Sequence, residues 1–286
     1  MFLFKRIAGL PFGVLYLLAD GLYLLFFYLI SYRKKVIIQN LRRSFPEKND
    51  REIGQLTKDF YRNLADIMVE TVKALTISQQ EMHRRVQLVH PEIPRQYVQN
   101  GQPVLLLTSH QCNWEWVLLG GSGLNMPIDA IYKPLHNAFF DRLMLSIRTR
   151  FGAYAIPIQR TLREVVRRKD LPRGIATVAD QMPDAEHAYW TTFLHQDTGF
   201  FTGTERIARS MNYPVVFVEV RRVKRGFYAL VFSKMAEPPY DTLPPNTITE
   251  RYVQQMERAI RANPADWLWS HKRWKHKRVF TSDINT

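Results

Sequence analysis

The chain has 286 residues, of which 46% are hydrophobic and 23% charged, a composition that supports a folded core and argues against intrinsic disorder. Forty Lys and Arg residues against 26 Asp and Glu residues give a net charge of +14, which favours polyanionic partners: nucleic acid, an anionic lipid surface or an acidic carrier molecule. The single cysteine, Cys112, excludes an intramolecular disulfide and a thiolate metal cluster built within one chain.

The N-terminal segment is the most apolar part of the sequence. Between Ile7 and Ile30, Asp20 is the one acidic or basic residue. At about 1.5 Å per residue, a helix of roughly 20 apolar residues can cross a hydrocarbon core of about 30 Å. We therefore predict a membrane-anchor helix over residues 1–32. The larger basic cluster, Arg33 to Lys35, follows this helix and places the rest of the chain on the cytoplasmic side by the positive-inside rule.

Two other interpretations of this segment stay open. A cleaved signal peptide is disfavoured, because the apolar region is too long and no small-residue cleavage site follows it. A helix that lies flat in the membrane interface is favoured by Pro11, Gly13 and Asp20. An acidic side chain at the bilayer centre costs about 2.5–3.5 kcal/mol on insertion scales, so spanning and lying flat are equally compatible with the sequence.

Residues 36–88 have a helical pattern. Asn49 can cap a helix whose first turn holds Glu52. The apolar residues that follow recur at three- and four-residue steps, as expected for an amphipathic helix packed on a core. These are Ile53, Leu56, Phe60, Leu64, Ile67 and Met68. A second, shorter helix is expected over residues 79–88.

Strands and helices alternate from about residue 103. Pro91 and Pro94 end the helical pattern, and Val104–Thr108 is a short, continuously apolar run typical of a strand buried on both faces. Further strands are expected at 127–132, 154–158, 174–179, 214–220 and 227–233, and helices at 139–151, 160–169, 204–211 and 247–262. The predicted fold is α/β, with a mixed, largely parallel central sheet flanked by helices and an N-terminal hydrophobic membrane-anchor helix. Residues 1–32 form the anchor and 33–286 one further domain.

The segment TSHQCNWE, residues 108–115, ends this buried strand. Ligands of open α/β sheets bind outside the carboxyl ends of the strands, so His110 stands where an active site is expected. Asn113 can cap the following helix, which puts Glu115 in its first turns. With His110 in the turn, the Glu115 carboxylate can reach one imidazole nitrogen and leave the other facing a substrate. Such a pair can remove a proton from an alcohol.

Other interpretations of the same segment are possible. A polar turn whose hydrogen bonds are satisfied internally is the ordinary alternative for a His followed by a Glu. Cys112 lies two residues from His110, so a Cys–His nucleophilic dyad is conceivable. A free cysteine is more often a small buried apolar residue.

Several blocks resemble one known family. His-x-x-x-x-Asp/Glu is the signature of glycerolipid-type acyltransferases, and SHQCNWEW is similar to the version in the lipid A biosynthesis (lauroyl/myristoyl) acyltransferase branch. Further blocks resemble that branch in order: YKPLHNAFFDRL at 132–143, IRTRFG at 147–152, ATVADQ at 176–181, FTGTERIARSMNYPVVFV at 201–218 and ADWLWSHKRWKHK at 265–277. Lys133 stands where the branch usually has Arg, and Met182 where it often has a second Asp. The resemblance covers nearly the whole chain, anchor included.

The resemblance implies an O-acyltransferase of the bacterial inner membrane that acts in lipid A, and so lipopolysaccharide, biosynthesis, with its catalytic domain on the cytoplasmic side. In that scheme His110 deprotonates a hydroxyl of a lipid A precursor or related glycolipid. The oxygen attacks the thioester of acyl-ACP or acyl-CoA, while Glu115 supports His110. No metal or other cofactor is implied. The residues implied in substrate binding, where cations can hold a phosphate or an oxyanion, are Lys133, Arg148, Arg150 and Asp180. Without the resemblance, the arginines are equally typical of a solvated helix face.

Alternative functions stay open at this point. The acceptor can be another lipid, such as an aminolipid or a lysophospholipid. A non-catalytic module that binds anionic membranes, or a membrane-anchored hydrolase, also fits parts of the sequence. The basic C-terminal segment 271–278 and the nearby Trp267 and Trp269 suit a membrane interface better than nucleic acid, given the apolar N-terminus. Three tryptophans over residues 267–274 predict that part of this segment packs.

Overall fold

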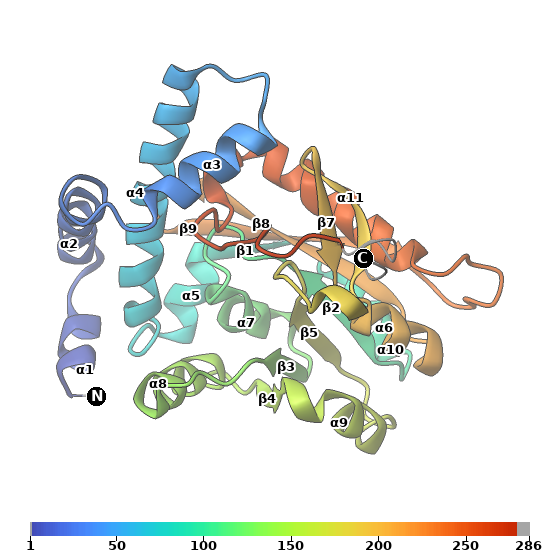
Figure 1. Ribbon diagram of the computed structural model, residues 1–286. Helices are drawn as coiled ribbons and strands as arrows, with labels where there is room; N and C mark the ends of the chain where they lie inside the picture. Colours follow the sequence, from blue (N-terminus) through green and yellow to red (C-terminus); the bar gives the residue numbers. More distant parts are fainter. Residues whose placement is uncertain (1, 279–286) are drawn as a thin grey trace, which may run out of the picture.

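The computed structural model of the protein describes residues 2–278. Its centre is a seven-stranded sheet with the order β1-β9-β8-β2-β5-β3-β4 (Figure 1). The strands are β1 (Val86–Val89), β2 (Val104–Thr108), β3 (Ile128–Tyr132), β4 (Tyr154–Pro157), β5 (Gly174–Val178), β8 (Val215–Lys224) and β9 (Phe227–Ala236). A separate hairpin consists of β6 (Tyr189–Phe193) and β7 (Gln196–Phe200).

The sheet is mixed and largely parallel, as the sequence predicts. β8 and β9 pair antiparallel, and the other neighbours pair in parallel. Strands β8, β2, β5, β3 and β4 therefore run in one direction, and their carboxyl ends meet at one edge of the sheet. This edge carries the residues described below as the candidate site.

Helices cover both faces of the sheet (Figure 1). They are α1 (Phe2–Gly9), α2 (Phe12–Leu24), α3 (Lys34–Ser44), α4 (Asp50–Lys73), α5 (Gln79–Arg85), α6 (Glu92–Gln99), α7 (Trp116–Gly121), α8 (Ala138–Arg148), α9 (Thr161–Arg167), α10 (Gly203–Met211) and α11 (Thr247–Ala262). Helix α2 continues into a π-helical turn at Leu25–Leu29. Short 3-10 turns lie at Ser122–Leu124, Ile158–Arg160, Ala185–His187 and Pro264–Asp266.

Strand β2 lies between two apolar cores. Leu105 and Leu107 pack with α4 and α11, whereas Val104 and Leu106 pack with α7 on the other face. All five residues of the strand are buried. Because successive strand residues point to opposite faces, a continuously apolar run is what such a doubly covered strand requires.

The N-terminal apolar segment is folded onto the rest of the protein. Phe12–Leu29 is long and apolar enough to cross a membrane, with a mean hydropathy of 1.8, and 22% of it is buried within the structure. Leu15, Ala19 and Tyr23 are the buried residues of α2 and belong to the core that α4 also lines. Large apolar side chains on its other faces are exposed, among them Leu17 and Leu24.

Two elements differ from the sequence-based expectation. The helical pattern over 79–88 ends at Arg85, and Val86–Val89 instead forms β1, because these residues pair in parallel with β9. Helix α6 begins directly after Pro91 and contains Pro94. Proline is tolerated there because the first N–H groups of a helix have no intrahelical acceptor.

The β6–β7 hairpin was not predicted from the sequence. Its two turn residues, Leu194 and His195, have φ values of 48° and 63°. Turns of this kind are usually signalled by Asn-Gly or Asp-Gly, and neither dipeptide stands at this turn. The Leu194 N–H is instead held by the Glu257 carboxylate of α11 at 3.0 Å, a contact from a remote part of the chain.

Candidate active site

His110 and Asp180 meet at the carboxyl edge of the sheet. They follow the neighbouring strands β2 and β5, in which Thr108 is the register partner of Val178. Both residues thus lie two positions beyond paired residues. Asp180 Oδ1 lies 2.6 Å from His110 Nδ1, and Asp180 Oδ2 accepts the His110 backbone N–H at 2.9 Å.

The Asp180 carboxylate is buried and fully engaged. It also accepts a hydrogen bond from Trp267 Nε1 at 2.8 Å, and its side chain is 2% exposed. Burial works against its charge, but the His110 imidazole and these hydrogen bonds outweigh burial and lower the pKa of Asp180 to about 2. Asp180 is therefore an anion at neutral pH.

The imidazole of His110 is correspondingly biased toward its protonated form. Burial disfavours the charged ring, but the charge and hydrogen bond of Asp180 outweigh this and raise the pKa of His110. In the neutral ring, Nδ1 donates to Asp180 and Nε2 is the acceptor nitrogen. The Gln181 amide nitrogen lies 3.3 Å from Nε2, and the Trp114 ring packs edge-on against the imidazole at 5.4 Å between centroids.

The prediction that Glu115 bonds to the His110 imidazole was wrong, because Asp180 is the carboxylate at Nδ1. In the described part of the chain Glu115 instead forms a two-pronged ion pair with Arg148, at 2.7 and 3.0 Å. Trp114 Nε1 donates to the same carboxylate at 3.1 Å. Burial disfavours the Arg148 cation, but the Glu115 charge outweighs burial and raises the pKa of Arg148.

Asn113 shapes the loop between these groups. Its Oδ1 accepts the Trp116 N–H at the start of α7, at 3.2 Å, as expected for a capping residue. The loop is also fastened from the C-terminal segment: Asp266 O accepts the Cys112 N–H at 2.8 Å, and His110 O accepts the Leu268 N–H at 3.1 Å.

The chain is similar to known proteins in sequence. Residues 1–276 match the family described as bacterial lipid A biosynthesis acyltransferase. The chain belongs to this family. It is 24% identical over 278 residues to the lipid A biosynthesis lauroyltransferase of Escherichia coli (strain K12), covering 94% of this chain and 88% of that protein. The crystal structure of a 1-acyl-sn-glycerophosphate acyltransferase, PlsC, from Thermotoga maritima covers 89% of this chain and 96% of its own, at 14% identity and a TM-score of 0.41.

Family membership makes the protein an acyltransferase that acts on a lipid. Of the acyltransferase residues expected from the sequence, His110, Asp180, Glu115 and Arg148 come together at one edge of the sheet. The resemblance in sequence implied only substrate binding for Asp180. Its place directly after an apolar strand was the available signal, but strand order was needed to set it beside His110.

Lys133 and Arg150 are less closely integrated. Lys133 is exposed and follows β3 at the same edge of the sheet. Arg150 donates from Nη1 to the Ala74 carbonyl at 2.8 Å, a contact that ties the end of α8 to the end of α4. Substrate binding by either residue stays a prediction.

Cys112 is fully buried, and its Sγ lies 3.1 Å from the Val220 carbonyl. Burial raises the pKa of its thiol well above the usual value. A thiol in this state is a poor nucleophile, which disfavours the Cys–His dyad.

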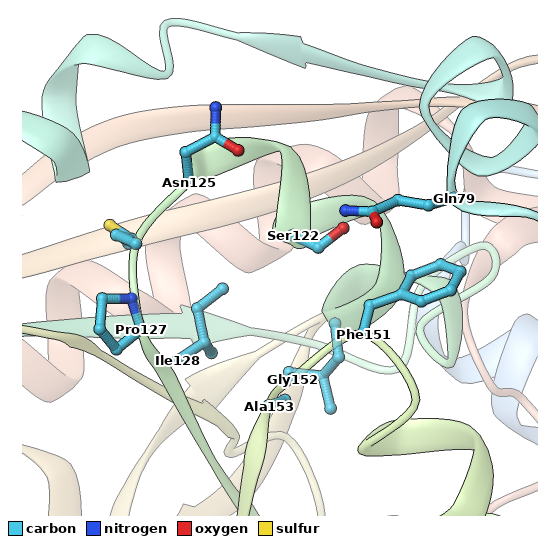
Figure 2. A pocket seen from close by; sticks show the side chains of 10 residues that line it. Gln79, Ser122, Asn125, Pro127, Ile128, Phe151, Gly152 and Ala153 are labelled. Atoms are coloured by element: carbon cyan, nitrogen blue, oxygen red, sulfur yellow. The ribbon is translucent and has the colours of Figure 1, made fainter.

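A cavity of about 300 Å³ lies at the opposite edge of the sheet (Figure 2). It is lined by Ile128 at the start of β3, by Ala153 just before β4, and by Gln79 and Ser122 among others. None of its lining residues titrates, and it lies at the amino ends of β3 and β4, so it is separate from the His110 site.

The C-terminal segment packs against the site, as the tryptophans predicted. Trp267 contacts Trp269 edge-on at 4.8 Å and Trp274 at 6.0 Å. Arg273 is fully buried, and its guanidinium lies 4.5 Å from the centroid of the Phe200 ring. Residues 267–274 are therefore part of the site framework, whereas residues 275–278 are exposed.

Proposed function

We propose that the protein transfers a fatty acyl chain from acyl-ACP or acyl-CoA to a hydroxyl of a lipid A precursor or related glycolipid, with His110 as general base. The observation that carries the proposal is the Asp180 carboxylate 2.6 Å from Nδ1, which leaves Nε2 as the acceptor at the carboxyl edge of the sheet. The family and the name of the lauroyltransferase relative support the choice of acceptor.

The reaction needs a group that first accepts a proton from the acceptor hydroxyl and then donates it to the leaving thiolate. His110 Nε2 takes the proton from the acceptor hydroxyl as its oxygen attacks the thioester carbonyl, which forms a tetrahedral oxyanion. When the carbon–sulfur bond breaks, the imidazolium returns the proton to the departing thiolate. Asp180 stabilises the imidazolium between these steps, and general-base assistance of this kind is worth about 10²–10⁴-fold.

Glu115 and Arg148 then act as a unit beside the base. The carboxylate fixes the Arg148 guanidinium by two hydrogen bonds, which orients a permanent cation at the site. That cation suits the developing oxyanion or a phosphate of the acceptor, and the exposed ammonium of Lys133 suits the same phosphate. Glu115 thus supports His110 at a distance, by its charge and by holding Arg148.

The apolar face of α2 is proposed to hold the protein at the inner membrane, with the catalytic domain on the cytoplasmic side. Exposed side chains on this segment include Leu17 (71%), Leu24 (53%) and Leu29 (79%). Asp20 is ion-paired with Arg225 at 2.7 Å, and the opposite face packs on the domain. A helix fastened in this way lies along one leaflet more readily than it crosses the bilayer.

The test is acyl transfer from lauroyl-ACP to a Kdo-bearing lipid A precursor by membranes that contain the wild type or His110→Ala. Acylated precursor from the wild type and none from the variant is the expected result. Free fatty acid in place of acylated lipid would identify a hydrolase. Equal transfer by His110→Ala would remove His110 from the mechanism.

A further inference from the structure

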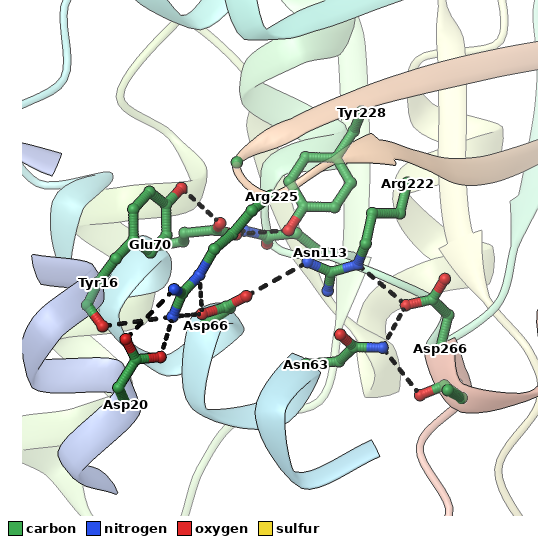
Figure 3. Close-up of polar contacts among 12 residues, drawn as sticks. Tyr16, Asp20, Asn63, Asp66, Glu70, Asn113, Arg222, Arg225, Tyr228 and Asp266 are labelled. Carbon is green, nitrogen blue, oxygen red and sulfur yellow. Dashed lines mark hydrogen bonds and ion pairs between the residues drawn. The ribbon is translucent and has the colours of Figure 1, made fainter. Parts of the chain in front are cut away.

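Glu70 is a fully buried carboxylate of α4 on which three other elements converge (Figure 3). The Tyr16 hydroxyl of α2 donates to Oε1 at 2.9 Å. Asn113 Nδ2 and the Tyr228 hydroxyl each donate to Oε2 at 2.7 Å. In addition, Trp116 Nε1 donates to the Glu70 backbone carbonyl at 3.0 Å. Glu70 therefore accepts hydrogen bonds from the apolar helix, from the sheet and from both ends of the Asn113–Trp116 turn.

We propose that Glu70 is a positioning residue that ties Tyr16 of the N-terminal apolar helix to Asn113 of the catalytic loop, residues 109–115, and so makes that helix part of the active-site framework. The inference deepens the proposed function, because it rests on His110 and Glu115 being the working groups of this loop.

The position of Asn113 explains why Glu70 reaches the chemistry. Asn113 uses both halves of its amide: Nδ2 donates to Glu70, and Oδ1 accepts from the first turn of α7. It lies between His110, which must meet Asp180, and Glu115, which must hold Arg148. A displacement of Asn113 therefore moves both pairs, and misplacement by about 1 Å can cost about 10²-fold in rate.

A second chain of contacts runs from the same helix to the same loop. Asp20 pairs with Arg225 at 2.7 Å, and Arg225 pairs with Asp66 at 2.7 Å. Arg222 bridges Asp66 at 3.5 Å and Asp266 at 3.1 Å, as Figure 3 shows. The Asp266 carbonyl then accepts the Cys112 N–H. Two paths thus join α2 to the adjacent loop residues Cys112 and Asn113.

The turn between β8 and β9 makes room for the Tyr16 side chain, which bonds to Glu70. Gly226 has a φ of 74°, and a Cβ at this position would collide with the Tyr16 hydroxyl. Glycine is required there twice, for the backbone conformation and for the close approach of the helix. The docking of Tyr16 is therefore built into the sheet as well as into α4.

The experiment uses the full chain in detergent, with lauroyl-ACP and a Kdo-bearing lipid A precursor as substrates. Glu70→Gln keeps the shape of the side chain but sets an NH₂ group against donors. We expect kcat to fall about 10–100-fold with KM little changed, because positioning rather than binding is lost. The acid limb of the pH–rate profile should also move to lower pH, because a displaced loop loosens His110 from Asp180. Tyr16→Phe should change kcat and the acid limb in the same direction but by less.

The double variant Glu70→Gln/Asn113→Asp exchanges donor and acceptor across the same hydrogen bond. It should recover most of the lost kcat and return the limb toward its wild-type pH. Glu47→Gln and Tyr154→Phe are matched controls: Glu47 is an exposed carboxylate, and Tyr154 loses an exposed contact with Glu164. Both should match the wild type.

Loss of folded enzyme would scale the whole pH profile without moving its limb, so an unmoved limb in Glu70→Gln would overturn the inference. Failure of the double variant to recover kcat would overturn it as well. If His110→Ala itself retains transfer, the proposed function fails and this inference with it. If His110→Ala is inactive but the acid limb of Glu70→Gln does not move, the inference alone is overturned and the proposed function stands.

Discussion

Two carboxylates compete for the role of histidine partner, and geometry separates them. Glu115 is near His110 in sequence, yet its oxygens are taken by Arg148 and Trp114. Asp180 is 70 residues away along the chain and forms the 2.6 Å contact with Nδ1. A carboxylate on Nδ1 fixes the tautomer and stabilises the imidazolium, whereas one that holds an arginine acts on the substrate's charge.

Exchanging each carboxylate for its amide tests this division. Burial lowers the pKa of His110 and Asp180 raises it, so Asp180→Asn removes the main contributions that oppose burial and should lower that pKa. The acid limb of kcat/KM should then move to lower pH, while the plateau falls about 10²–10⁴-fold. Glu115→Gln should also lower the plateau, with a smaller move of the limb, because its contact with His110 is through space.

The check is the pH dependence of kcat/KM for both variants, with Asp241→Asn on an exposed loop as the control. A larger limb shift in Glu115→Gln than in Asp180→Asn would reverse the assignment.

Helix α2 is an element with two different faces. Leu15 is fully buried in the core shared with α4, whereas Leu17, two residues on, is 71% exposed. The Tyr16 and Asp20 side chains fasten the helix to α4 and to the β8–β9 turn. The helix is thus both a structural part of the domain and the carrier of its exposed apolar surface.

These two leucines should respond differently to the same substitution. Leu15→Ala should lower the free energy of unfolding by about 2–5 kcal/mol, the usual cost of a cavity in a packed core. Leu17→Ala should leave that free energy nearly unchanged but weaken membrane binding by about 2 kcal/mol, at about 0.8 kcal/mol per carbon removed.

Denaturant titration and sedimentation with lipid vesicles measure the two quantities. Equal effects of Leu15→Ala and Leu17→Ala on stability would mean that α2 does not dock as described.

At the scale of the whole molecule, an exposed apolar segment is combined with a net charge of +14. An apolar surface can bind lipid of any charge, whereas cations contribute only at anionic surfaces, about 1 kcal/mol for each one near the headgroups. Salt shortens the range of the second contribution from about 10 Å at 0.1 M to about 3 Å at 1 M.

Binding to anionic vesicles should therefore weaken as salt is raised and level off at the affinity for neutral vesicles. Sedimentation of the full chain with both vesicle types between 0.1 and 1 M salt measures this. Complete release from both types at high salt would leave no role for the apolar surface of α2.

The sequence by itself determined features that depend on neighbouring residues. The apolar run Val104–Thr108 required a strand covered on both faces, and His110, two residues beyond it, marked the candidate site at the carboxyl edge of the sheet. The capping box at Asn49 and Glu52 set the start of α4. Turn residues without a glycine signal, at Leu194 and His195, could not be found in this way.

Only the tertiary structure decided which distant groups meet. The pairing of β2 with β5 sets Asp180 beside His110, and nothing in either segment specifies that neighbour. The packing of α2 on α4 likewise turned an apparent free anchor into a docked helix, because Tyr16 finds the buried Glu70. Hydrophobic periodicity reports how each segment is buried, but strand order and helix docking depend on the fit of all segments together.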